Sequence, residues 1–174
     1  MTRLCWTGVL AESTEICVLD ETLRGIHVES TVHGNFGSCE YTLIADRGWH
    51  FQSLTVAVDD RSLRVDYDGI AWITDGATRR DLDGAREVDI AISPFSNSLP
   101  IRRLRLDIGQ SADLITAYVT VPELAVVADP QRYTRLTDYE YRYESLDSDF
   151  TRTITVDEHG LVLSYPGLFI RTDG

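Results

Sequence analysis

The chain of 174 residues contains no lysine, so all 16 of its basic residues are arginine, set against 28 acidic residues. The formal net charge is −12 at pH 7. Such a charge repels the phosphates of nucleic acids and the anionic headgroups of lipids. The composition therefore argues against a nucleic-acid partner, and against attachment to membranes through a basic surface.

The sequence also lacks the segments that export a protein or insert it into a membrane. Residues 1–14, MTRLCWTGVLAEST, have neither the charged start nor the continuous apolar run of a secretory signal. No stretch approaches the roughly 18 consecutive apolar residues of a membrane span. We therefore expect a cytoplasmic protein without stable membrane insertion.

Signatures of metal sites and of common enzymes are missing as well. The three cysteines contain no C-x-x-C pair, and the four histidines contain no H-E-x-x-H. The sequence has no G-x-S-x-G, no P-loop and no dinucleotide-binding glycine motif. We accordingly predict no metal ligands, no cofactor and no catalytic residues.

What the sequence does contain is an alternation of apolar and polar residues. In GIHVESTVH, Ile26, Val28 and Val32 alternate with polar or charged residues, as in a half-buried strand. In WHFQSLTVAV the apolar phase shifts after Phe51, which one extra residue at a β-bulge would explain. The pattern and the length predict a single domain over residues 1–174, mainly β, with a curved antiparallel sheet.

One segment, SPFSNSLPIRRL at 93–104, interrupts this alternation. Ser98 could cap a short helix with Pro100 in its first turn, and apolar residues recur after it at helical spacing. We expect one or two short helical turns near residues 98–108.

The same segment is a candidate binding site. Asn97 and Ser98 offer amide and hydroxyl groups, and the guanidinium groups of Arg102 and Arg103 could bind a phosphate, a carboxylate or a sugar. Both arginines could instead pair with acids of this acidic chain. A purely structural corner therefore remains the alternative.

Aromatic residues supply further candidates. Trp6, Trp49 and Trp72 could wall an apolar cavity with their polar tips turned toward a ligand, and Arg132 and Tyr133 join them as candidate ligand-binding residues. Packing within the core explains the same aromatic residues without any ligand.

Carboxylates leave an enzymatic alternative open. Asp81 and Asp83 lie two residues apart and, with His50, could serve a hydrolase-like enzyme that acts on a small polar or lipid-derived substrate. Turns stabilised by aspartate side chains explain the pair equally well. A third possibility is a structural or interaction module with a solid core.

Several blocks of the chain together resemble the family known as "putative glycolipid-binding". They are RLCW at 3–6, DLDGAREVDIAISPFSNSLPIRRL at 81–104, VPELAVVADPQRYTRL at 121–136, YRYES at 141–145 and DEHGLVLSYPGLFIR at 157–171. The resemblance implies a bacterial protein with a spiral β-roll, similar to the carriers of bacterial lipoproteins. It also implies that a glycolipid, or another amphipathic acyl-bearing ligand, binds in an apolar interior without catalysis.

Overall fold

The computed structural model describes residues 1–10 and 12–172. Within these residues one sheet of fifteen strands runs in the order β8-β7-β6-β5-β4-β3-β2-β1-β15-β14-β13-β12-β11-β10-β9. Its first half comprises β1 (Thr2–Gly8), β2 (Ser13–Thr22), β3 (Gly25–Gly34), β4 (Gly37–Ala45), β5 (Phe51–Val58), β6 (Arg61–Tyr67), β7 (Trp72–Thr74) and β8 (Ala77–Thr78). Its second half comprises β9 (Glu87–Ile90), β10 (Ser111–Val119), β11 (Val126–Arg135), β12 (Glu140–Ser145), β13 (Thr151–Val156), β14 (Val162–Tyr165) and β15 (Phe169–Arg171). The short 3-10 helix η1 (Arg80–Leu82) and the helix α1 (Phe95–Leu104) complete the described elements.

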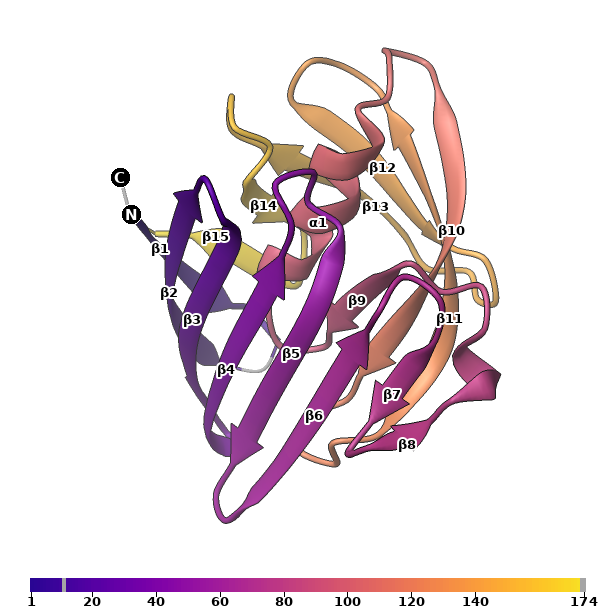
Figure 1. Cartoon of the computed structure of the whole chain (residues 1–174). Coiled ribbons are helices and arrows are strands. Elements are labelled where there is room, and N and C mark those ends of the chain that lie inside the picture. The colour runs from indigo at the N-terminus through magenta and orange to yellow at the C-terminus, as the bar shows by residue number, and fades with distance from the viewer. Residues whose placement is uncertain (11, 173–174) are drawn as a thin grey trace.

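The sheet is strongly curved and does not close. Strands β1–β6 form one wall, β9–β13 lie across from them, and β14 and β15 continue the sheet from β13 to β1 (Figure 1). Neighbouring strands are antiparallel except β9 and β10, which are parallel. The predicted fold class, a mainly β chain with a curved antiparallel sheet and one short helix, is confirmed.

The alternation seen in the sequence sets which face of each strand is buried. In β3, Ile26, Val28 and Val32 are buried while the intervening His27 is exposed. The register between β4 and β5 shifts after Phe51, because Ser53 rather than Gln52 pairs with the next residue of β4. The predicted β-bulge is therefore confirmed, and it lets both Phe51 and Leu54 face the core.

Side chains join the two edges of the sheet. The edge strands β8 and β9 follow each other in the chain, with η1 between them. Trp72 on β7 donates from Nε1 to the carbonyl oxygen of Ala85 at 3.1 Å, and Arg79 donates from Nη2 to the carbonyl oxygen of Val126 at 2.8 Å. These hydrogen bonds tie β7 and the segment before η1 to the opposite end of the sheet.

The helix α1 connects the parallel strands β9 and β10, but it begins earlier than predicted. Pro94 occupies the N-cap position and Pro100 lies inside the helix, so the prediction that Ser98 caps it is wrong. The reason is packing: Phe95 and Leu99 are both fully buried, and a helical backbone from residue 95 places them one turn apart on the same face.

The helix α1 lies between two hydrophobic clusters. Phe95 and Leu99 belong to the larger cluster, built mainly from β1–β7, β9 and β10, whereas Ile101 belongs to a second cluster with the tyrosines of β11, β12 and β14. Every residue from Phe95 to Ile101 is buried. The helix therefore fills this part of the space that the sheet encloses (Figure 1).

Within residues 1–10 and 12–172, no helix has the length and the apolar character that crossing a membrane would need.

Candidate functional site

A cavity of about 420 Å³ lies where the two hydrophobic clusters meet, next to Asn97 in the first half of α1. Its walls come from β9 and the segment that joins it to α1, from α1 itself, from β10, β11, β12 and the turn after β12, and from β14, β15 and the turn between them. We call it the acidic cavity because the carboxylates of Asp89, Asp129 and Asp147 line it. None of the arginines lines it among the described residues.

Two of these carboxylates are held by one amide. Asp89 on β9 accepts a hydrogen bond from Nε2 of Gln131 at 2.8 Å, and Asp129 on β11 accepts one from the same nitrogen at 2.6 Å. Asp89 also accepts from Oγ of Ser96 on α1 at 2.7 Å. Gln131 is fully buried, so it fixes both carboxylates in place.

The electrostatic environment makes ionisation of the two carboxyls costly. Loss of solvent is the largest cause that raises the pKa of Asp89, with hydrogen bonds from Ser96 and Gln131 acting against it. Loss of solvent also raises the pKa of Asp129, and the nearby charges of Asp89 and Asp147 raise it further. Among residues 1–10 and 12–172, no ion pair involves any of these aspartates.

Aromatic rings form a connected wall on another side of the acidic cavity. The ring centroid of Tyr143 lies 5.9 Å from those of both Phe150 and Tyr165, and Tyr165 lies 6.4 Å from Phe169. All four residues line the cavity, and Tyr118 adds a further phenol. The combination of apolar ring faces with a few polar groups is typical of small-molecule sites.

Asn97 adds an acceptor. This residue is 4% exposed and lines the cavity. Its Nδ2 donates to the hydroxyl oxygen of Tyr133 at 2.8 Å, which fixes the orientation of the amide. Within the described part of the chain no hydrogen bond reaches Oδ1 of Asn97. This oxygen is therefore available to a ligand.

The buried carboxyl of Glu15 is hydrogen-bonded to a residue that lines the cavity. Ser93 lines the cavity and donates from Oγ to Oε1 of Glu15 at 2.8 Å. The same oxygen accepts from the hydroxyls of Ser30 at 2.7 Å and Tyr41 at 2.8 Å. Burial raises the pKa of Glu15 to about 7, although these hydrogen bonds act in the opposite direction.

Of the binding residues predicted from the sequence, Asn97 lines the acidic cavity. The predicted arginines lie elsewhere. The guanidinium carbon of Arg102 lies 4.1 Å from the ring centroid of Trp49, and its Nη1 lies 3.3 Å from a carboxylate oxygen of Glu21. Arg103 pairs with the buried Glu87.

The other predicted binding residues are spread over the fold. Arg132 pairs with Asp113 at 2.6 Å on exposed parts of β10 and β11. Trp6 and Trp72 are each 1% exposed and lie in the larger hydrophobic cluster. Ser98 is fully buried, and its Oγ has no hydrogen-bond partner among the described residues.

The residues of the enzymatic alternative do not line the acidic cavity either. His50 contacts Asp46, with 3.0 Å between Nδ1 and a carboxylate oxygen. Asp81 pairs with Arg79 at 2.6 Å, and Asp83 follows η1 on the surface. The carboxylates that the fold does bring together, Asp89 and Asp129, are distant in sequence.

Two comparisons with known proteins find similar proteins. Residues 3–171 match the model of a family described as "Putative glycolipid-binding". Among solved structures, the chain is similar to a DUF1089 family protein from Pseudomonas aeruginosa, with a TM-score of 0.78 and 34% sequence identity over 91% of this chain and 92% of that one. A search of curated proteins finds no match.

Proposed function

Because the chain belongs to the family described as "Putative glycolipid-binding", we propose that it binds the polar head of a glycolipid, or of a similar acyl-bearing amphiphile, in the acidic cavity and releases it unchanged. The observation that carries this proposal is the meeting of a connected aromatic wall with fixed hydrogen-bond acceptors in one cavity. Sites for small ligands usually measure about 300–1,000 Å³. At about 420 Å³ the cavity suits a sugar-sized head better than a whole lipid.

The lining matches the chemistry of a sugar on two sides. A sugar ring has apolar C–H faces, which can pack on Tyr143 and Tyr165, and hydroxyl groups, which can donate to Asp89, Asp129 and Oδ1 of Asn97. Hydrogen bonds to charged acceptors are about twice as strong as neutral ones. The carboxylates therefore supply both affinity and orientation.

The acyl chain would start on the apolar side of the same cavity. Leu168 in the turn before β15 and Phe169 at the start of β15 line it together with Ile90 and Ala91. Burial of each methylene contributes about 0.8 kcal/mol. The first few methylenes of a chain therefore add appreciable affinity even if the rest of the tail stays outside the cavity.

Titration with octyl glycosides tests the proposal. Phe150→Ala removes part of the aromatic wall, so we expect binding of octyl glycosides to weaken about tenfold in calorimetric titrations. Phe36→Ala is the matched control, since Phe36 is also a partly buried aromatic residue but packs on the larger cluster, away from the cavity. If the parent bound neither neutral nor amino octyl glycosides with a Kd below about 1 mM, the proposal would fail.

A second candidate function is hydrolysis of a glycolipid or a related molecule. It is favoured by Asp89 and Asp129, two carboxyls with raised pKa values that share Gln131 inside the acidic cavity, because paired carboxyls of this kind can act as acid and base. Mass spectrometry of the octyl glycosides after incubation separates the candidates. Intact probes agree with binding alone, whereas free octanol and free sugar would indicate hydrolysis.

A further inference from the structure

We propose that the head bound in the acidic cavity carries a positive charge, as an amino sugar does. The inference rests on the proposed function and specifies the class of ligand. It starts from the three aspartates Asp89, Asp129 and Asp147, which line one cavity and take part in none of the ion pairs of the described residues.

Asp89 and Asp129 are half-buried, unlike the exposed Asp147, and unpaired carboxylates that are withdrawn from water are costly to keep ionised. A buried carboxylate is normally paired with a cation or takes up a proton. The amide of Gln131 and the hydroxyl of Ser96 donate hydrogen bonds to Asp89 but bring no charge. Among the described residues, the carboxylate of Asp129 receives a hydrogen bond only from the shared amide of Gln131. A bound ammonium would therefore supply a positive charge to balance these carboxylates.

The acceptors of the acidic cavity also match the donors of an ammonium group. A primary ammonium has three N–H donors and no acceptor. Oδ1 of Asn97, a residue that lines the cavity and is only 4% exposed, receives no hydrogen bond among the described residues, since the amide donates its Nδ2 to Tyr133. Together with the carboxylates of Asp89 and Asp129, it offers acceptors for each of these donors.

The aromatic wall favours a cation over a neutral head. The faces of tyrosine and phenylalanine rings attract cations, and the attraction grows when the site excludes water. Tyr143 and Tyr165 lie on the same cavity as the carboxylates. A neutral sugar can pack on these rings and donate hydrogen bonds to the carboxylates, but it brings no charge to balance theirs and gains no cation–π attraction.

The same charges discriminate against anionic heads. A phosphate or sulfate in the cavity would face three aspartates without an arginine among the lining residues that the structure describes. The net charge of −12 acts in the same direction over longer distances. Phosphorylated lipid heads without an amine are therefore expected to be excluded.

A set of matched octyl probes tests the inference by calorimetric titration. The probes are octyl glucosaminide, its N-acetyl form, octyl glucoside, octyl glucoside 6-phosphate and octylamine. We expect the glucosaminide to bind at least about tenfold more tightly than the glucoside or the N-acetyl form, and the phosphate not to bind.

Equal affinity for the glucosaminide and the glucoside would overturn the positive charge of the head while leaving the proposed function intact. If octylamine bound as tightly as the glucosaminide, the sugar would contribute nothing, so the glycolipid of the proposed function would be ruled out while the positive charge of the head would stand.

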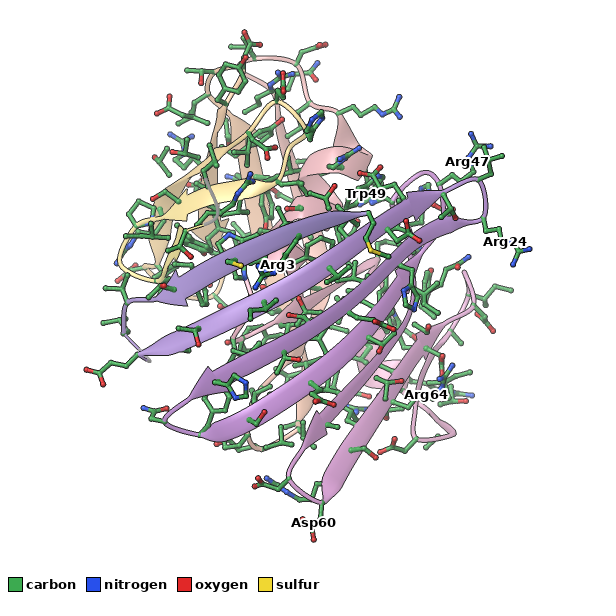
Figure 2. The ribbon with its side chains drawn as sticks, turned by 90° about the vertical axis from the view of Figure 1, so that its left-hand side faces the viewer. Arg3, Arg24, Arg47, Trp49, Asp60 and Arg64 are labelled. Atoms are coloured by element: carbon green, nitrogen blue, oxygen red, sulfur yellow. The ribbon has the colours of Figure 1, made fainter. Side chains whose placement is uncertain are left out.

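Substitutions test whether the aspartates of the acidic cavity cause the preference for the glucosaminide over the glucoside. Asp129→Asn and Asp147→Asn should each reduce the preference for the glucosaminide to below about threefold. Asp60→Asn makes the same change of charge at the tip of the β5–β6 hairpin, whose strands contribute nothing to the cavity, and should keep the full preference (Figure 2). Asp147 is exposed, so its variant is expected to fold even if the Asp129 variant does not. An unchanged preference in folded Asp147→Asn and Asp129→Asn would overturn the assignment of the charge to this cavity.

Discussion

Glu15→Gln is expected to remove roughly 2.5 kcal/mol of pH dependence from the free energy of unfolding between pH 5 and pH 8. Glu15 lies on β2 with its side chain turned into the core, 3% exposed. Burial raises its pKa from 4.5 to about 7 in the folded protein. The folded state therefore holds a proton that the unfolded chain has already released over most of this pH range.

The sign follows from proton linkage. Where the folded state binds more protons than the unfolded state, the free energy of unfolding falls as the pH rises. The contribution of Glu15 is fully present below pH 4.5 and is lost as the pH rises through about 7. Glutamine does not titrate, so the variant should gain stability over the parent as the pH rises from 5 to 8.

Urea unfolding of the parent and the variant at each pH measures the effect. Glu29→Gln is the matched control, since it makes the same chemical change on the exposed face of the neighbouring strand β3. Its stability should follow the parent at every pH. If the curves of Glu15→Gln and the parent ran parallel from pH 5 to pH 8, the raised pKa of Glu15 would be contradicted.

Trp72→Ala is expected to lower the free energy of unfolding by about 3–5 kcal/mol, the usual cost of removing a large buried aromatic side chain. Trp72 is 1% exposed and stacks between Phe51, at 5.2 Å between ring centroids, and Tyr67, at 4.9 Å. Its Nε1 also donates to the carbonyl oxygen of Ala85, which joins β7 to the segment before β9. Urea unfolding at constant pH measures the loss.

Trp72→Phe separates packing from the hydrogen bond. Phenylalanine keeps a ring between Phe51 and Tyr67 but has no N–H for the carbonyl oxygen of Ala85. It should lose about 1–3 kcal/mol, because a buried acceptor is left without a partner. A loss below about 1 kcal/mol for Trp72→Ala would contradict the role of Trp72 in joining the edges of the sheet.

Much of the fold could be predicted from the sequence because the alternation of apolar and polar residues along a strand shows which of its faces is buried. The alternation in GIHVESTVH identifies the buried face of β3, and the phase shift after Phe51 identifies the bulge of β5. The bounds of α1 could not be predicted in this way. They depend on the burial of Phe95 and Leu99 against the larger hydrophobic cluster, which is a tertiary contact.

The candidate site could be predicted only in part, because its residues meet through the fold. Asp89 on β9 and Asp129 on β11 are brought together across β10, and nothing in their local sequence marks the pair. Glu15 did leave a signal: in STEICVLD it occupies the phase of the buried residues Ser13 and Cys17. A charged residue on the buried face of a strand indicates a polar network, and this one leads to Ser93 in the acidic cavity.

The central claim is that the acidic cavity holds the head of an amphiphile in the cell. Native mass spectrometry tests it on protein purified from its own host, with Ser148→Trp as the cavity-filling variant, since Ser148 lines the cavity from an exposed turn after β12. Ser62→Trp, at an exposed position of β6, is the matched control. We expect a non-covalently bound amphiphile to appear as added mass on the parent and on Ser62→Trp, and to be missing from Ser148→Trp. A parent without added mass, or the same added mass on Ser148→Trp, would contradict the claim.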